Sequence, residues 1–228
     1  MSEQRKDLYA AELAAQNLLT VALSGPQRLT NAAHLLIGDL VEALRAREGN
    51  RSKRSVHVVI QLLNRASNDL RCAAQIAHHG YSAQAATIVS SLYESALTAA
   101  YIGADEVLAY EWLGHENTHR SFRPAWDLAT VIGGADEAKT KLVYAVYQGL
   151  CMPKHINPIV ESQMGVEMID GVPFLRNGPD TSEFARHVAF FSLVMGCRLI
   201  AFSIAHLVDA LLDPVVGERF RANADWTT

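Results

Sequence analysis

The stretch from Gly80 to Gly103 reads GYSAQAATIVSSLYESALTAAYIG. Glycine at each end can adopt the left-handed conformation in which helices often terminate, and Ser82 is a residue type that caps the start of a helix. The residues between are apolar or small on nearly every side, which is typical of a buried helix rather than a surface one. This stretch therefore predicts a core helix of an all-α fold.

The rest of the chain shows the same helical recurrence of apolar residues, interrupted by Gly and Pro, and divides into about seven helices. The expected ranges are about 4–23, a second helix to about 48, then 55–79, 82–102, 105–120, a short piece at 124–133, 136–150 and a long last helix at 180–212. Short connections favour antiparallel neighbours. We therefore expect a multi-helix bundle in which residues 1–228 form a single helical domain.

One long segment, from Met152 to Asp180, breaks this pattern with four prolines and three glycines, a density that excludes a long regular helix. Within it, an Asp170-Gly171 turn separates two short alternating runs. The sequence therefore predicts a small β-hairpin at about 165–176. The tail at about 215–228 has too few apolar residues to require order, and we expect it to be flexible.

The composition limits the class of protein. Half of the 228 residues are apolar and 19% are charged, which is the profile of a globular chain. The formal net charge of -4 argues against nucleic acid as a partner, because affinity for phosphate backbones comes mainly from clustered Lys and Arg. The three cysteines form no C-x-x-C pair, and the N-terminus carries charges where a secretory signal needs an apolar run. We expect a cytoplasmic protein without a cofactor.

The most apolar stretch, from Val188 to Leu212, is as long as the ~20 residues that span a membrane. Arg198, His206 and Asp209 interrupt it, and the longest piece without charge or histidine is too short to cross a bilayer. We therefore expect a core helix of a soluble protein, with no membrane contact.

Glu94 is the only formally charged residue in the 33 positions from Cys72 to Ala104. A buried carboxylate must be paired, hydrogen-bonded or protonated, because isolated charge in a low dielectric is costly. We therefore expect a polar pocket around Glu94, with the carboxylate mostly buried and bonded to a side chain of another helix. The candidates for this pocket are Arg65, Arg71, His78, Tyr147, His155 and Arg198. For the stripes on which Arg71 and Arg198 lie, we expect a solvated polar face, with a functional groove as the alternative.

The Gly80 to Gly103 stretch resembles a bacterial family of helical proteins, domain of unknown function 5677. Gly80, Ala83 or Ala86, Ser91, Leu92, Tyr93, Glu94 and Tyr101 match the family pattern, and Tyr147, Leu150, His155 and Pro158 resemble a later segment of it. Ser90 stands where relatives commonly have an arginine, so an ion pair built on that arginine must differ here. The resemblance covers about residues 55–160 and implies a helical fold without implying an activity.

The segment from His115 to His119, HENTH, has the H-E-x-x-H pattern that places two histidines on one face of a helix for zinc, with Glu116 as base. Arg123-Pro124 interrupts the helix soon afterwards, and no second motif supplies a third ligand. We therefore expect no bound metal, with His115, Glu116 and His119 as the only weak candidates for a zinc-dependent hydrolase.

Arg71 and His78, with six residues between them, resemble the R-x4-6-H element of HEPN ribonucleases, which are also compact helical proteins. Arg51 and His57 fit this loose pattern equally well. The leading hypothesis is a non-enzymatic binding or interaction module, with a HEPN-like ribonuclease as the alternative. We expect the chain to form a homodimer and to bind a small ligand or a partner protein.

Overall fold

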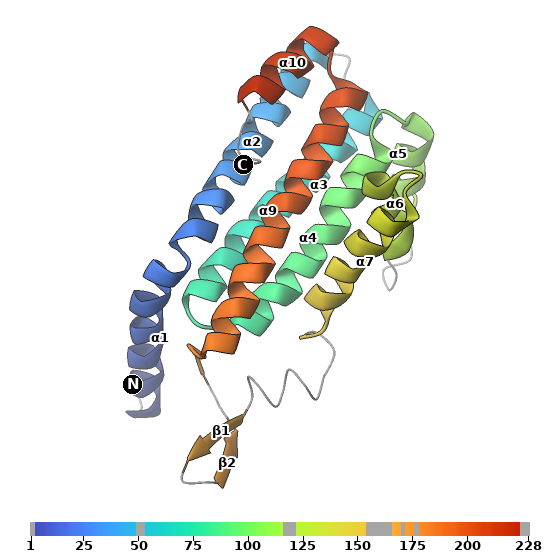
Figure 1. Cartoon of the computed structure of the whole chain (residues 1–228). Helices are drawn as coiled ribbons and strands as arrows, with labels where there is room; N and C mark the ends of the chain where they lie inside the picture. The colour runs from blue at the N-terminus through green and yellow to red at the C-terminus, as the bar shows by residue number, and fades with distance from the viewer. Residues whose placement is uncertain are drawn as a thin grey trace.

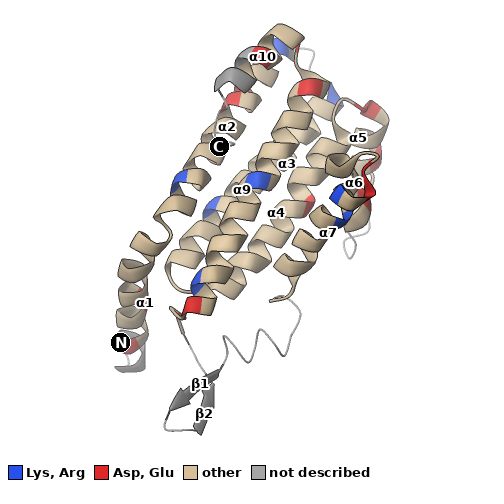
Figure 2. Ribbon diagram, in the orientation of Figure 1, with Lys and Arg blue, Asp and Glu red and all other residues tan. Residues whose placement is uncertain are grey.

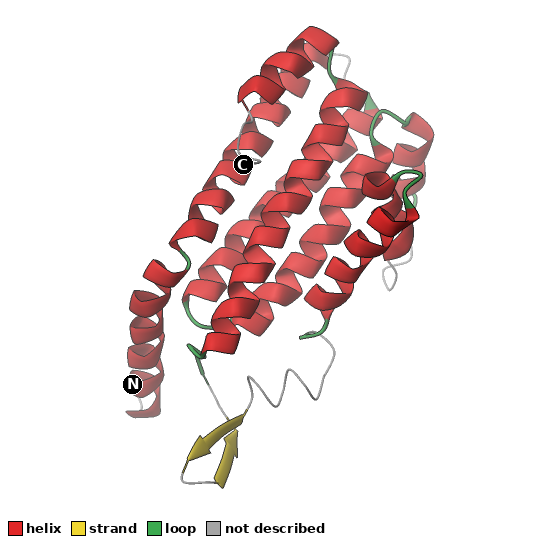
Figure 3. Cartoon of the chain, viewed as in Figure 1, coloured by secondary structure: helices red, strands yellow, loops and turns green. Residues whose placement is uncertain are grey.

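The computed structural model describes residues 3–48, 53–115, 122–153, 166–169, 172–175 and 178–223. Within these residues the chain forms nine helices and one pair of short strands (Figure 3). The expectation of an all-α helical bundle is confirmed, although about seven helices were expected.

Three long helices form the centre of the bundle: α3 (Arg54–His78), α4 (Ser82–Ile102) and α9 (Glu183–Leu211). A tight turn at Gly80 joins α3 to α4, and its φ of 88° is a conformation that favours glycine. The two helices therefore pack as antiparallel neighbours, and α9 lies alongside α4 (Figure 1). A Cβ on Gly196 would lie 3.1 Å from the Leu70 side chain, so this glycine allows α9 to approach α3 closely.

The α4 helix is buried on most of its surface, as its composition predicts. Leu92, Tyr93 and Leu97 have no exposed surface, and Ser95 and Thr98 are buried as well. Charged residues are sparse along α4 and α9 and gather towards the outer helices and the helix ends (Figure 2). Apolar packing against α4 therefore holds the bundle together.

Helices α1 (Glu3–Ala22) and α2 (Ser24–Glu48) form a long bent arm along one side of the bundle (Figure 1). The chain scarcely leaves the helix between them, because Leu23 N–H donates to Leu19 and Gln27 N–H donates to Leu23. Pro26 lies in the first turn of α2, where its missing N–H is not needed. Gly25-Pro26 thus bends the arm instead of separating two independent helices.

Three short helices cover the other side of the bundle: α5 (Glu106–Leu113), α6 (Ala125–Gly133) and α7 (Glu137–Cys151). The Asp105 and Asp136 side chains cap α5 and α7 by accepting backbone N–H groups of their first turns. The expectation that the fifth helix reaches about residue 120 is wrong, because α5 ends at Leu113 and Gly114 follows as its C-cap.

The chain between α7 and α9 contains β1 (Val166–Ile169) and β2 (Val172–Leu175), which pair antiparallel with Val166 opposite Leu175. After α9, helix α10 (Pro214–Asn223) occupies much of the tail that the sequence suggests is flexible. The Asp213 side chain accepts the Val215 N–H at 2.9 Å, and proline is well suited to the first position of a helix. Asp213-Pro214 therefore both ends α9 and starts α10.

Candidate functional site

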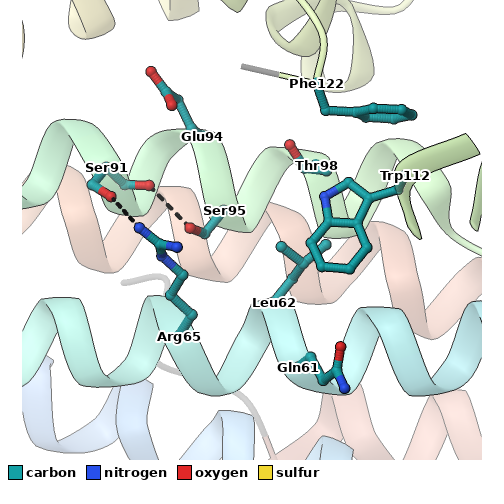
Figure 4. Close-up of a pocket in the computed structure, with 9 residues that line it drawn as sticks. All are labelled: Gln61, Leu62, Arg65, Ser91, Glu94, Ser95, Thr98, Trp112 and Phe122. Carbon is teal, nitrogen blue, oxygen red and sulfur yellow. Dashed lines mark hydrogen bonds between the residues drawn. The ribbon is translucent and has the colours of Figure 1, made fainter. Parts of the chain in front are cut away.

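A cavity of about 350 Å³ lies beside Glu94, between α3, α4 and α5 (Figure 4). Its polar groups come mainly from α3 and α4, and its aromatic groups come from α5 and the segment before α6. The lining residues are Gln61, Leu62, Arg65, Ser91, Glu94, Ser95, Thr98, Trp112 and Phe122. We call this the Glu94 cavity.

Glu94 is joined to another helix by one hydrogen bond. The Tyr147 hydroxyl, on α7, donates to Glu94 Oε1 at 2.9 Å. Burial and the negative charge of Glu94 raise the pKa of Tyr147 well above its usual range, so the phenol keeps its proton at neutral pH. Glu94 itself is half-buried, with the cavity beside it, and the bond to Tyr147 agrees with the expected partner from another helix.

Aromatic packing holds Tyr147 in place. Its ring lies 4.8 Å from that of Tyr93 and 6.3 Å from that of Tyr144, between ring centroids. Tyr93 is fully buried, and its hydroxyl donates to the Ala125 carbonyl at the start of α6. Burial raises the pKa of Tyr93, and the neighbouring Tyr144 adds to the shift. The cluster therefore fastens α6 and α7 onto α4 and sets the position of the Tyr147 hydroxyl.

Arg65 lines the same cavity without bonding to Glu94. Its guanidinium lies 3.4 Å from the Ser91 hydroxyl and 3.8 Å from the Asp69 carboxylate. Figure 4 shows the Glu94 carboxylate pointing away from Arg65, which lies at the opposite end of the cavity from Trp112. Burial of Asp69 raises its pKa, and Arg65 partly opposes this shift. Arg65 is therefore balanced mainly by Asp69.

The aromatic end of the cavity is held by Arg123. Its guanidinium donates to Glu111 on α5 at 2.6 Å and lies 4.3 Å from the centre of the Phe122 ring. It also lies 5.6 Å from the Tyr101 ring on α4. Ion pairing and cation–π contact thus fix the segment before α6 against α4 and α5, which positions Phe122 over the cavity.

Arg71 and His78 line a second cavity, of about 550 Å³, enclosed by α1, α2 and α3. Arg71 is exposed and His78 is half-buried. The His78 Nε2 lies 3.0 Å from Gln27 Oε1, and burial, with a smaller contribution from His79, lowers the pKa of His78. The structure thus brings these two candidates together, away from Glu94.

The remaining candidates lie elsewhere. Arg198 is exposed on α9, as are His187 and Asp209 of the same stripe, so this stripe faces solvent in the single chain. His155 lies outside the described residues. By length and composition α9 could cross a membrane, although half of its most apolar stretch is buried in the bundle.

The zinc motif is only partly described, because Glu116 and His119 lie outside the described residues. His115 follows the end of α5, and its ring makes an edge contact with Phe122 at 5.8 Å between ring centroids. Within the described part of the chain, no three His, Cys, Asp or Glu side chains are grouped as metal ligands.

Comparison with known proteins found no matching family model, no curated relative and no similar solved structure. The resemblance of the Gly80 to Gly103 stretch to a bacterial family therefore stays a prediction.

Several lining residues escaped the sequence analysis. Trp112 lies on α5 and Phe122 lies in the segment before α6, and no periodic pattern relates them to Glu94. Gln27 and Asn31 lie one helical turn apart on α2, opposite His78. Their spacing could have suggested a polar face on α2, but only the packing of α2 on α3 reveals which histidine they meet.

Proposed function

We propose that the protein is a non-enzymatic helical binding module whose ligand site is the Glu94 cavity. The observation that carries this proposal is a half-buried carboxylate held by Tyr147 at the edge of a cavity with an aromatic end. Its volume falls within the ~300–1,000 Å³ typical of small-molecule sites. Tyr147 is the one hydrogen-bond partner of Glu94 in the described part of the chain, so the carboxylate keeps acceptor capacity for a ligand.

The chemistry of the lining favours a positively charged ligand with an apolar body. Glu94 supplies the negative charge, and the Trp112 indole attracts cations as well as apolar groups. Phe122, whose ring already contacts the Arg123 guanidinium, adds apolar surface. Arg65 does not oppose this choice strongly, because it lies at the far end of the cavity near Asp69. A small amine or a basic side chain of a partner protein would satisfy both ends of the cavity.

Calorimetry with benzylamine and benzyl alcohol tests this proposal, because the two probes share a ring and differ in charge. We expect benzylamine to bind the wild-type chain and benzyl alcohol to bind at least about tenfold more weakly. Glu94→Gln should abolish this preference. Glu218→Gln, which alters an exposed carboxylate on α10, is the control and should leave it unchanged. Equal binding of the two probes, or no binding of either, would remove the proposal.

A HEPN-like ribonuclease is the second candidate, and the common cavity of Arg71 and His78 is the observation that favours it. Hydrolysis would need a base, and the lowered pKa of His78 leaves its imidazole neutral at physiological pH. Incubation with a labelled single-stranded RNA, followed by denaturing electrophoresis, decides this alternative. Cleavage that is lost in both Arg71→Ala and His78→Ala would replace the binding module as the function.

A zinc-dependent hydrolase has less support, because His115 lies beyond the end of α5 and therefore outside the helical face that the motif requires. We propose that the purified protein holds no stoichiometric zinc. Elemental analysis that finds one zinc per chain, lost in His115→Ala, would contradict this.

We also propose that two copies pair through the exposed face of α9. Phe191 and Phe202 are 43% and 49% exposed there, with Arg198 between them. Lipid against this face would place Arg198 in hydrocarbon, at a cost of about 2.5–3.5 kcal/mol or more. Antiparallel two-fold pairing would instead bring Arg198 of each copy opposite Asp209 of the other copy. The two-fold symmetry makes these two pairs equivalent. A soluble, cytoplasmic homodimer fits this face better than a membrane protein.

Sedimentation equilibrium tests the pairing. The wild-type chain should have the mass of two chains, and Phe202→Glu should have the mass of one. Val107→Glu, at an exposed position on α5, is the control and should remain dimeric. Recovery of the wild-type chain only from detergent-extracted membranes, or as a monomer at all concentrations, would contradict this proposal.

A further inference from the structure

The second cavity is lined almost entirely by polar side chains, from three helices. Its volume of about 550 Å³ is larger than that of the Glu94 cavity. The lining residues are Gln16, Gln27, Thr30, Asn31, Arg71, Ala74, Gln75, His78 and His79. They comprise one arginine, two histidines, four side chains with amide or hydroxyl groups on α1 and α2, a glutamine and an alanine. We call this the Arg71 cavity.

The described lining residues carry positive charge and no negative charge. Arg71 is the only permanently charged residue of the lining, and no carboxylate is among the described lining residues. The Arg71 guanidinium has no ion pair or hydrogen bond to any described residue. A guanidinium offers five N–H donors and no acceptor, so this side chain is available for a ligand with negatively charged oxygens.

Two consecutive hydrogen bonds in the cavity involve the side-chain oxygens of Gln27 and Asn31. Gln27 Oε1 can only accept, so His78 Nε2 carries the proton that joins them at 3.0 Å. Gln27 Nε2 in turn donates to Asn31 Oδ1 at 3.1 Å. Both amide oxygens are thereby occupied, and the Asn31 amide keeps its N–H groups for a ligand. Among these two amides, the groups left unbonded are therefore donors.

The His79 side chain also donates a hydrogen bond within the protein. Its Nδ1 lies 2.7 Å from the Gln75 carbonyl oxygen, which can only accept, so Nδ1 must carry a proton. Neither imidazole therefore adds a negative charge to the lining, and Arg71 alone gives it a permanent charge.

We propose that the Arg71 cavity binds the phosphate group of a small phosphorylated molecule. Phosphate supplies several strong acceptor oxygens, which match the Arg71 guanidinium and the unbonded N–H groups of the Asn31 amide. The cavity falls within the volume range of small-molecule sites, so it has room for an organic group attached to the phosphate. This inference is independent of the Glu94 cavity, and it requires binding without cleavage.

Titration of the ¹⁵N-labelled full-length chain with adenosine 5′-monophosphate, adenosine and inorganic phosphate tests the inference. We expect saturable shifts with the monophosphate and with phosphate, and binding of adenosine weaker by at least about tenfold. Arg71→Gln should weaken binding of the monophosphate by a similar factor. Arg198→Gln, an exposed arginine outside both cavities, is the matched control and should bind like wild type.

Two further measurements make the outcome decisive. His78→Ala should also weaken binding, because it releases Gln27 from its fixed orientation, while circular dichroism reports whether each variant stays folded. A short single-stranded RNA that competes with the monophosphate would identify a phosphodiester as the source of the phosphate, and failure to compete would identify a monoester. Absence of binding by both phosphate probes, or equal weakening in Arg71→Gln and Arg198→Gln, would overturn the inference.

Discussion

Replacing Tyr147 by phenylalanine removes the one hydroxyl that links α7 to Glu94 and leaves the ring to pack against Tyr93 and Tyr144. A hydrogen bond to a charged group contributes about 1.5–3 kcal/mol to stability. Glu94 is half-buried, so water competes for its oxygens and the contribution should lie near the lower limit. We expect Tyr147→Phe to lower the free energy of unfolding by about 1–1.5 kcal/mol. The ~3–5 kcal/mol expected for a stranded buried charge does not apply.

Urea denaturation of a double-mutant cycle isolates this bond. Tyr147→Phe and Glu94→Ala, alone and combined, should give a coupling energy of about 1 kcal/mol. Tyr144→Phe is the matched control, because no described side chain bonds to its hydroxyl, and it should change stability by less than about 0.5 kcal/mol. A coupling energy below about 0.3 kcal/mol would show that the 2.9 Å contact contributes nothing and would refute the reasoning.

The same bond predicts how stability changes at alkaline pH. Burial and Glu94 raise the pKa of Tyr147 in the folded chain, whereas the unfolded value stays near 10. Its contribution is therefore fully present below about pH 10 and is lost as the pH rises through the folded pKa. The pKa of Tyr93 is also raised, but Tyr93 is present in both the wild type and Tyr147→Phe, so its effect cancels in the comparison. Wild type should thus lose stability more steeply than Tyr147→Phe above pH 10, and parallel curves would contradict the assignment.

Other predictions concern the elements that frame the cavities. Gly133→Ala should destabilise the chain by more than about 2 kcal/mol, because the new Cβ would lie 2.8 Å from the Thr140 backbone nitrogen. Gly38→Ala should stabilise the chain by about 0.5–1 kcal/mol, because no atom lies within 4 Å of the new Cβ. Thermal denaturation that ranks them otherwise would disprove this packing. Ser55→Ala should cost about 0.5–2 kcal/mol, because the Ser55 hydroxyl and N–H bond to Glu106 at 2.6 and 2.8 Å. These bonds lower the pKa of Glu106, so the free energy of unfolding should fall as the pH drops below about 4.5. The fall should be smaller in Glu106→Gln. Equal acid titrations of the two proteins would show that the Glu106 carboxylate does not stabilise the fold.

The sequence predicts the central helices well, because local signals agree there with the tertiary packing. Gly80 and Gly103 mark the ends of α4, and its apolar composition predicts the burial that the structure shows. Where the same residues can either end one helix or start the next, the sequence analysis identified only one of the two roles. Asp213-Pro214 is a helix stop and equally an N-cap followed by a first-turn proline, and the structure uses both meanings.

The candidate site shows a similar limit. The isolation of Glu94 among apolar residues predicts that it needs a partner, and Tyr147 was among the candidates. Counting charges along one helix shows neither which neighbouring helix supplies the partner nor how much of the side chain that helix covers. Trp112 on α5 lines the cavity beside Glu94, and its position there does not follow from the sequence around Glu94.

The polar stripe on α3 shows why a surface pattern alone does not locate a site. Asn64, Asn68 and Arg71 are exposed, as an ordinary solvated face requires. The same helix nevertheless borders two cavities, because α4 and α5 flank its first half while α1 and α2 flank its second half. Arg65 lies near an acidic partner and Arg71 does not, although both are exposed arginines on one helix. The neighbouring helices, more than the stripe itself, therefore determine which of the two can hold an anion.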